Sequence, residues 1–529
     1  MLKARHFTIL GNCPFDDYRR DFFSSITSSS SPQAKYAHNL LIMFVGTTGD
    51  AEHCDSIRET WKLLLKKSLP ANKFQGLRFA LFALGDRAYG PLAFCAAGRK
   101  LATRLIQLGA ECFCGIGFGD DCTANGGVFA DLDVWLDEEL LPAIHNKIIA
   151  CMPERSSPFV VNDSPKWDEA PYKVTVEHSA DRDSLKQLQP LEEESYCNFF
   201  HTVAPITAYR YDDSRHNSPR SPLTAIVVSN DCITDPEWHQ DVRHIKVHVG
   251  VPSKSALPSK PYNAGDIATV MPQNSSNSVE RILSVLPRKI QRIADKQICV
   301  ERLQLDASYW PERCTLRGLL TYCADINGRP EREFLRSLSV FIDQSQPSGK
   351  AQAEKLVQLS ESAGAALYAD YIIRERRNYA DVLHDFDDVR NVDGSNELTV
   401  GHFLSILPPM LPRHFSIASS PSTHEDISAI CTNNTTTSTE FGVELCVAVV
   451  KEKTPLGRIY DGLCSSFLSQ LKPQPRDNGI KSHVKLWIRP GSFDNLPLSL
   501  SSTTAGKFEI PVLYIGAGTG VAPLRALYR

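Results

Sequence analysis

The sequence has no long hydrophobic run, no paired cysteine motif and no marked excess of charge of one sign. Its clearest apolar run near the start, Leu40–Val45, is far shorter than the ~20 residues needed to cross a bilayer, and the first thirty residues lack a signal-peptide core. The fifteen cysteines form no CxxC pair and no zinc-finger spacing, which favours reduced thiols over disulfides or zinc. A net charge of −4 provides no basic field for nucleic acid. These absences predict a cytoplasmic protein without a nucleic-acid, membrane or metal role.

What is present is enough material for several folded domains. The chain has 529 residues, of which 42% are hydrophobic and 22% charged, so we expect three or four domains with apolar cores. The changes in pattern along the chain predict four segments. These are an α/β domain at 1–148, a linker at 149–221, a β-barrel at 222–505 with a helical insertion at about 277–397, and the start of a nucleotide-binding domain at 506–529.

Strand, loop and helix repeat three times in the first segment. Each apolar run of strand length enters a loop that contains glycine: Leu40–Val45 enters Gly46–Gly49, Gly76–Leu84 enters Gly85–Gly90, and Glu111–Ile116 enters Gly117–Asp121. A helical stripe follows each loop, at Ile57–Leu65, at Phe94–Leu108 and around Trp135 and Leu140. This order predicts a doubly wound sheet whose three loops lie at one edge, where open α/β sheets bind ligands.

The middle of the chain changes character twice. Residues 149–221 are rich in Pro, Ser and acidic side chains and predict a linker. In the strand pattern that follows, apolar residues alternate with His244 and His248, which places both histidines on a polar face and disfavours a metal site. After the helical insertion, strands are expected again from Leu398. The acidic run Asp381–Asp388 and His402 are both predicted to lie on the solvated surface.

The tetrapeptide Arg413-His414-Phe415-Ser416 combines a permanent cation, an aromatic ring and a small hydroxyl. In an extended strand, Arg413 and Phe415 share one face, and His414 and Ser416 share the other. A guanidinium matches the oxygens of a pyrophosphate, and an aromatic ring can stack on a flat heterocycle. Taken alone, these four residues are more typical of an ordinary barrel strand with an exposed arginine and a core phenylalanine.

Two glycine-containing segments follow and change that interpretation. Gly462–Leu468 comes after the apolar strand Val443–Val450 and is predicted to be a turn that opens a helix, where free backbone N–H groups attract phosphate. Ile510–Ile515 is predicted to be a short buried strand that runs into Gly516-x-Gly518-x-Gly520 and then a helix with Pro523 in its first turn. Strand, glycines and helix in that order indicate a dinucleotide phosphate site.

Together these three motifs resemble the ferredoxin-NADP-reductase-like module, and the three loops of the first segment resemble the flavodoxin-like FMN domains of diflavin reductases. The loop Leu84–Tyr89 matches the leucine-glycine-aspartate loop of those domains. The chain is therefore similar to the diflavin reductase family, and within it to the soluble type of cytosolic iron–sulfur cluster assembly. The fold implied is an α/β multidomain protein: a flavodoxin-like doubly wound sheet, an FAD-binding antiparallel β-barrel with a helical insertion, and the start of an NADPH-binding α/β domain.

The resemblance also implies cofactor contacts and one catalytic residue. The cofactors are FMN, FAD and NADPH, with Tyr89 stacking on FMN, Arg413 at the FAD pyrophosphate, Phe415 stacking on FAD and Ser416 as the catalytic residue near the hydride-accepting nitrogen. Arg458 is equally consistent with a role at FAD and with an ordinary surface position. The residues expected to bind a cofactor are Thr47, Thr48, Gly49, Leu84, Gly85, Asp86, Tyr89 and Asp120 for FMN, Arg413, His414, Phe415, Ser416, Gly462, Leu463, Cys464 and Ser465 for FAD, and Gly516, Gly518, Thr519 and Gly520 for NADPH.

The sequence departs from the family pattern near both ends. No hydroxyl-rich phosphate loop with a strand before it precedes Leu40, so the first βα unit is expected to be missing and FMN to bind weakly. The chain reaches Arg529 soon after the glycine repeat, so FAD binding is expected but turnover with NADPH is expected to be poor.

The resemblance further implies a one-electron acceptor such as an anamorsin-type Fe–S protein. Two alternatives remain open: a reductase for a haem or sulfite-reductase partner, and a non-catalytic truncated flavoprotein scaffold.

Overall fold

The computed structural model describes residues 40–48, 51–123, 127–149, 170–177, 194–204, 221–250, 261–304, 307–391, 397–420, 440–473, 483–491 and 511–528. The chain divides into two compact units. The first comprises Met1–Lys166 with Glu354–Arg374, and the second comprises Trp167–Ala353 with Glu375–Arg529. No helix within the described ranges is long and apolar enough to span a bilayer.

A parallel sheet forms the centre of the first unit. Its strands lie in the order β2-β1-β3-β4, and β5 also pairs with β3. The pairs β1–β3, β3–β4 and β3–β5 are parallel, and only the two-residue β2 is antiparallel. The strands are β1 (Leu40–Thr48), β2 (Glu52–His53), β3 (Arg78–Gly85), β4 (Glu111–Cys112) and β5 (Gly117–Asp120).

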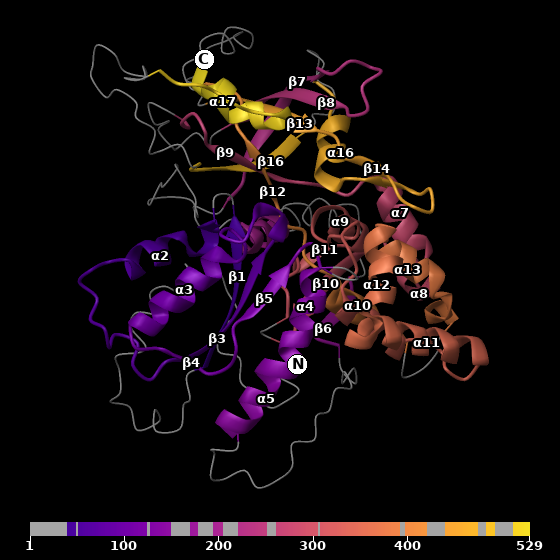
Figure 1. Cartoon of the computed structure of the whole chain (residues 1–529). Helices are drawn as coiled ribbons and strands as arrows, with labels where there is room; N and C mark the ends of the chain where they lie inside the picture. Colours follow the sequence, from indigo (N-terminus) through magenta and orange to yellow (C-terminus); the bar gives the residue numbers. More distant parts are fainter. Residues whose placement is uncertain are drawn as a thin grey trace. The chain divides into compact units, whose positions relative to one another are not determined.

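Helices cover both faces of this sheet, because alternate residues of β3 point to opposite sides. Leu81 lies in one apolar core with Leu64 and Leu101, which come from two helices on that side. Phe82 lies in a second core with Trp135 on the other side. The helices are α2 (Arg58–Leu64), α3 (Ala96–Gln107), α4 (Val128–Trp135) and α5 (Leu141–Ile144) (Figure 1). The predicted doubly wound architecture is confirmed.

The third predicted strand is wrong in its position. The predicted strand Glu111–Ile116 reduces to the two residues of β4, and β5 occupies most of the predicted loop Gly117–Asp121. A Cβ atom on Gly117 would lie 2.2 Å from the ring of Phe82 and 2.7 Å from that of Trp135, so only glycine lets the chain pair with β3 here. Gly117 is therefore a packing residue of a strand. The sequence pattern predicted a loop residue here, because glycine is most often a sign of a turn.

The second unit is built on a six-stranded antiparallel sheet with the order β12-β9-β16-β7-β8-β13. A single bridge between Ile417 and Leu445 joins the chain after β12 to β13, and the Ala418 N–H donates to the Glu444 carbonyl oxygen at 2.8 Å. The sheet corresponds to the antiparallel part of the predicted barrel. Its strands are β7 (Leu223–Cys232), β8 (Val242–Gly250), β9 (Ile267–Met271), β12 (Arg413–Ser416), β13 (Glu440–Ala448) and β16 (His483–Arg489) (Figure 1).

Two segments inside the predicted linker are ordered elements of the second unit, so the linker prediction is wrong for them. Strand β6 (Tyr172–Val176) pairs with β10 (Gln297–Arg302), which also pairs with β11 (Arg313–Thr315). Residues 194–203 are helical, and Phe199 within them is fully buried. The partner of β6 is more than a hundred residues away in the chain, so a local pattern of five residues could not reveal the pairing.

Between the sheet strands the chain forms many helices, of which α12 and the part of α11 from Glu354 onward belong to the first unit and the others to the second. The described helices of the stretch from Ser276 to Ile406 are α7 (Ser276–Ser284), α8 (Arg288–Gln291), α9 (Leu316–Tyr322), α10 (Arg332–Val340), α11 (Pro347–Ser360), α12 (Ala365–Tyr368), α13 (Tyr379–Asp385) and α14 (Val400–Ile406). The expectation that strands resume at Leu398 is wrong, because helix α14 begins two residues later, at Val400. The Thr399 hydroxyl accepts a hydrogen bond from the His402 N–H at 3.3 Å and caps this helix. His402 is buried rather than solvated.

Asp381 corrects another surface prediction, because its side chain is only 3% exposed. Arg281 and Arg458 both form ion pairs with it. Burial alone would raise the pKa of Asp381, but the Asn378 N–H and the two arginines outweigh it and lower the pKa. Arg458 also donates to the Glu375 carbonyl oxygen at 3.3 Å. The contacts of Arg458 are therefore those of a structural residue that ties the hairpin β14 (Lys451–Lys453)–β15 (Ile459–Asp461) to α13.

Candidate functional site

The first predicted FMN loop begins at the end of β1. The Thr47 hydroxyl accepts a hydrogen bond from the Ala97 N–H at 3.3 Å, which ties the strand end to the start of α3. Thr48 is exposed, and its hydroxyl lies 3.5 Å from the Glu52 carbonyl oxygen. Gly49 lies outside the described residues. Both threonines are at the carboxyl edge of the sheet, where a ligand of an open α/β sheet is expected.

The second loop follows β3 and presents Tyr89 to solvent. Leu84 and Gly85 end the strand, and a Cβ atom on Gly85 would lie 2.6 Å from the Cys95 backbone nitrogen, so glycine is required there. The Asp86 carboxylate accepts a hydrogen bond from the Ala88 N–H at 2.7 Å and caps a short 3-10 turn. Tyr89 ends that turn and is 74% exposed. An exposed aromatic ring on a hydrogen-bonded loop is suited to stack on a flat ligand.

Asp120 ends β5 and holds the second loop in place. Its carboxylate accepts hydrogen bonds from the backbone N–H groups of Arg87 at 3.0 Å and Cys122 at 3.1 Å, and Arg87 Nε lies 3.2 Å from it. Only 4% of Asp120 is exposed. The carboxylate thus positions the loop that carries Tyr89, whereas a direct contact between Asp120 and a flavin stays a prediction.

In the second unit, Phe415 of β12 packs against the same apolar core as Cys464 and Phe467 of helix α16 (Leu463–Gln470). Burial raises the pKa of the Cys464 thiol to about 12, and the positive charge of Arg413 acts on that thiol in the opposite direction. The Arg413 side chain is partly exposed and also pairs with Asp325 at 3.2 Å. Strand β12, which carries the Arg413 cation, and the start of α16, which carries a set of backbone donors, thus lie on the same core of the second unit. Cys464 itself is buried, as expected of a packing residue.

The other residues of β12 follow the predicted alternation. Phe415 packs, half-buried, against the apolar core of the sheet together with Phe467 of α16. His414 bonds to the Thr269 hydroxyl at 2.9 Å and lies 3.3 Å from Arg489, so protein groups already occupy both of its ring nitrogens. Ser416 is half-buried, and its hydroxyl has no hydrogen-bond partner among the residues that the structure describes.

The start of α16 has the form of an anion site. Gly462 is its N-cap, and no described side chain caps this end of the helix. A Cβ atom on Gly462 would lie 2.7 Å from the Cβ of Val450, so the chain can pass here only as glycine. The Ser465 hydroxyl accepts from the Val450 N–H at 3.0 Å and fixes the first turn against the end of β13. The N–H groups of a first turn, including those of Leu463, Cys464 and Ser465, lack acceptors within the helix and attract phosphate.

The third motif forms a glycine turn but no strand. The described residues 511–517 are not in a strand, and the large side chains of Leu513 and Ile515 are exposed, so the predicted buried strand is wrong. A strand of a parallel sheet needs neighbouring strands to satisfy its backbone and cover its faces, and the described residues supply none here. The turn η12 (Gly518–Gly520), which contains Thr519, leads into α17 (Val521–Tyr528), and Gly518 has a φ of +55°. No atom lies within 4 Å of a Cβ built on Gly518 or Gly520, which leaves space for phosphate oxygens.

Helix α17 is held against the sheet by a buried ion pair. Arg525 Nη1 lies 2.5 Å from Glu444 Oε2 and donates to the Ala418 carbonyl oxygen at 2.6 Å. Glu444 is 5% exposed, and His244 Nε2 lies 3.0 Å from its carboxylate. Burial alone would raise the pKa of Glu444, but His244 and Arg525 outweigh it and bring the pKa to about 2. Sequence reasoning missed this pair, although a glutamate inside the apolar run Val443–Val450 was a usable signal.

The described residues fit flavin nucleotides and a dinucleotide phosphate. In the second unit, Arg413, the uncapped first turn of α16, a half-buried aromatic ring and an unpartnered hydroxyl are the groups that a pyrophosphate and a flavin ring require. In the first unit, Tyr89 offers its exposed ring on the loop after β3, at the same edge of the sheet as the two threonines that end β1. The open turn at Gly518–Gly520 fits a second pyrophosphate.

Comparison with known proteins gives the same assignment. The FAD binding domain model matches residues 215–467, and the Flavodoxin model matches residues 26–135. The chain is 29% identical over 501 residues to NADPH-dependent diflavin oxidoreductase 1 of Danio rerio, covering 93% of this chain and 70% of that protein. It is 29% identical over 497 residues to the protein of the same name from Mus musculus (92% and 70%), and 27% identical over 527 residues to that of Emericella nidulans (94% and 68%).

Both matched models and the relatives agree with the geometry of the two units. The expected cofactors are thereby confirmed at the level of the family. The two matched models and the relatives together support the diflavin reductase family of oxidoreductases, whose cofactors are NADPH, FAD and FMN.

Proposed function

We propose that this protein carries electrons from NADPH to an Fe–S protein of cytosolic iron–sulfur cluster assembly, and that it acts in the cytoplasm. The electron path through FAD and FMN is that of its relatives, which are NADPH-dependent diflavin oxidoreductases. The acceptor and the location rest on the resemblance to the soluble iron–sulfur assembly type of the family. An anamorsin-type Fe–S protein is the partner that this resemblance suggests.

One observation carries the proposal: the uncapped first turn of α16 packs on the same apolar core as Phe415 of β12, the strand that also carries Arg413. A guanidinium and a helix N-terminus together stabilise a pyrophosphate through charge-assisted hydrogen bonds and the helix dipole. Phe415 on the same face of β12 would cover a flavin ring and exclude water from it. The Ser416 hydroxyl is available to donate a hydrogen bond to a ring nitrogen.

When bound, the cofactors would supply the redox chemistry: hydride transfer from NADPH to FAD, and transfer of single electrons from FMN to the acceptor. The protein contributes binding, orientation and exclusion of water. In the first unit, Asp86 and Asp120 hold the loop that carries Tyr89, so the stacking ring needs no rearrangement when a flavin binds. A [2Fe–2S] protein accepts one electron at a time, so it suits a flavoprotein that delivers single electrons.

The test is electron transfer from NADPH to three purified acceptors, measured anaerobically by absorbance with the full chain loaded with FAD and FMN. The acceptors are an anamorsin-type [2Fe–2S] protein, a b-type haem protein and a sulfite reductase. We expect the [2Fe–2S] protein to be reduced at least tenfold faster than the other two. Preferential reduction of the haem protein or the sulfite reductase would replace the proposed acceptor, and a chain that binds FAD but reduces none of the three would support the scaffold alternative.

A further inference from the structure

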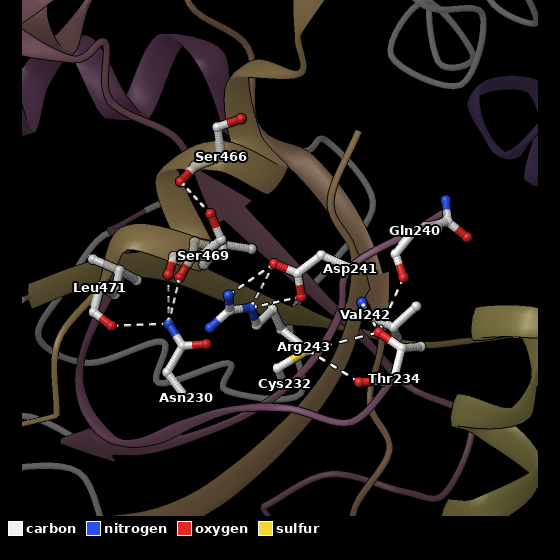
Figure 2. Close-up of polar contacts among 11 residues, drawn as sticks. Asn230, Cys232, Thr234, Gln240, Asp241, Val242, Arg243, Ser466, Ser469 and Leu471 are labelled. Carbon is white, nitrogen blue, oxygen red and sulfur yellow. Dashed lines mark hydrogen bonds and ion pairs between the residues drawn. The ribbon is translucent and has the colours of Figure 1, made fainter. Parts of the chain in front are cut away.

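Asn230 near the end of β7 binds the far end of the FAD-site helix. Its side-chain Nδ2 lies 2.9 Å from the Leu468 carbonyl oxygen, 3.1 Å from that of Ser469 and 2.8 Å from that of Leu471. Figure 2 shows the amide pointing at the carbonyl groups where α16 ends. The three acceptors are more than two hundred residues away in the chain, so this is a tertiary contact that no local pattern predicts.

A β-bulge places Asn230 on the face where α16 lies. Before the bulge, Val227 of β7 pairs with Val247 of β8, and both side chains are buried in the core of the sheet. The register shifts between Val227 and Ser229, after which Asn230 pairs with the buried core residue Ile245. Directly opposed residues of a sheet share a face, so the extra residue turns Asn230 toward the core side. Without the bulge, strict alternation would point its side chain away from α16.

The chemistry of this contact requires a donor. The last carbonyl groups of a helix lack partners within it and carry the negative end of the helix dipole. An amide NH₂ brings two N–H donors, so Asn230 satisfies two of the three carbonyls fully or shares its hydrogens among them. Aspartate has nearly the same shape but would place only acceptor oxygens against carbonyl oxygens. The site therefore selects asparagine over its closest isostere.

Fixing the carboxyl end of a short helix also fixes its start. Helix α16 has eight residues, so its two ends are only about 12 Å apart and move as one rigid element. At the start, the Ser465 hydroxyl binds the Val450 N–H. At the end, the described residues place Asn230 on the carbonyl groups. Together the two contacts determine where the first-turn N–H groups point.

We propose that Asn230 is a positioning residue for the FAD pyrophosphate: by binding the carbonyl end of α16, it aims the first turn of the helix at the phosphate oxygens. This inference rests on the proposed function, because it takes the start of α16 as the phosphate site. Asn230 contacts no cofactor itself. It acts only through the orientation of the helix.

The experiment compares Asn230→Ala and Asn230→Asp with the control Thr234→Val in the full chain. Thr234 lies in the loop that connects β7 to β8. Its hydroxyl donates to the Gln240 carbonyl oxygen at 3.0 Å and accepts from the Val242 N–H at 3.1 Å (Figure 2). Thr234→Val removes these two hydrogen bonds and the 3.6 Å contact of the hydroxyl with Cys232 Sγ, and it leaves the contacts of Asn230 with α16 intact. FAD affinity is measured by titration of the apoprotein with flavin fluorescence, and thermal unfolding of each apoprotein checks that it is folded.

We expect Asn230→Ala to bind FAD at least tenfold more weakly than wild type, Asn230→Asp to be at least as weak as Asn230→Ala, and Thr234→Val to stay within about twofold. A second readout is the ³¹P NMR shift of the pyrophosphate at saturating FAD, which reports its surroundings independently of stability. It should move toward the value of free FAD in both Asn230 variants and stay unchanged in Thr234→Val.

Two outcomes overturn separate parts of this reasoning. Wild-type affinity and an unchanged ³¹P shift in both Asn230 variants would overturn the role of Asn230 while leaving the FAD site in place. A folded wild-type chain that takes up no FAD would overturn the proposed function, and the inference with it. Should Asn230→Ala fail to fold, Asn230→Asp at saturating FAD decides the question through the ³¹P shift alone.

Discussion

The two candidate flavin sites of this chain are held in different ways. In the first unit, Tyr89 stands on a loop whose shape depends on two carboxylates, Asp86 and Asp120, that accept backbone N–H bonds. In the second unit, Arg413 and Phe415 belong to a strand paired along its length with β9. Loop residues can be re-aimed by a single side-chain change, whereas strand residues are fixed by the sheet. The two sites should therefore fail differently under mutation.

The largest effect on cofactor binding is expected at Gly462 in the second unit, where the packing leaves no space for a side chain. Gly462→Val would force a side chain against Val450 and Ser465, whose nearest atoms lie 2.7 and 2.9 Å from the added Cβ. Displacing the start of α16 should weaken FAD binding about a hundredfold or more, because both the N–H donors and the dipole move. FAD titration of the apoprotein measures this. Gly250→Ala is the matched control, since its Cβ would meet only the Thr224 carbonyl oxygen at 3.7 Å, and an equal loss in both variants would contradict the prediction.

The buried ion pair beneath α17 should show in stability and in its pH dependence. The pKa of Glu444 is lowered from 4.5 to about 2, so the pair stabilises the fold fully above about pH 4.5 and less as the pH falls toward 2. Glu444→Gln should lower the free energy of unfolding of the second unit by about 2 to 3 kcal/mol at pH 7. Urea unfolding of both proteins at several pH values measures the difference, which should shrink between about pH 4.5 and pH 2.

Glu452→Gln is the control for this experiment. Glu452 pairs with Arg376 at 3.1 Å, but about half of each side chain is exposed. An exposed pair of this kind contributes only about 0 to 1 kcal/mol. A Glu444→Gln effect no larger than that of the control, or one independent of pH, would show that the buried pair does not hold α17.

A smaller effect on FAD affinity should distinguish Arg413, which we expect to bind FAD, from Arg458, whose role the sequence did not decide. Arg413→Gln removes the cation that we expect at the FAD pyrophosphate and should weaken FAD binding about ten- to a hundredfold, the range of a charged hydrogen bond. Arg458→Gln leaves Asp381 with Arg281 alone, so it should lower thermal stability while the folded protein keeps its FAD affinity. FAD titration and thermal unfolding of both variants distinguish them. Weaker FAD binding by folded Arg458→Gln alone would reverse this assignment.

The smallest effect is expected in the loop of the first unit. Asp120→Asn keeps the shape of the side chain but replaces one acceptor oxygen by a donor, so the loop should lose part of its support and Tyr89 its position. FMN affinity should fall about tenfold, and FAD affinity should not change. Separate titrations with the two flavins test this. An FMN affinity that is insensitive to Asp120→Asn would mean that Tyr89 is positioned by other contacts.

Sequence patterns predicted the elements that depend on neighbours close in the chain. The runs Leu40–Val45 and Gly76–Leu84 became β1 and β3, and the glycine after Val443–Val450 became the cap of α16. Prediction failed where the deciding partner is distant. Strand β6 needs β10, and Asp381 is buried because Arg281 and Arg458 reach it from other elements. The exposed residues Leu513 and Ile515 looked like a buried strand because apolar content alone does not supply a pairing partner.

For the candidate sites, the sequence by itself determined the chemistry: a cation, an aromatic ring and a hydroxyl on one short strand, glycines at phosphate turns, and an aromatic residue after a leucine-glycine-aspartate loop. These follow from residue types and spacing, because alternation along a strand and the free N–H groups of a helix start are local properties of the backbone. Only the tertiary structure decided which groups act together. The bulge that turns Asn230 onto α16 and the burial that pairs Glu444 with Arg525 arise from contacts between segments far apart in the chain, and the energies of such contacts depend on geometry that no single segment contains.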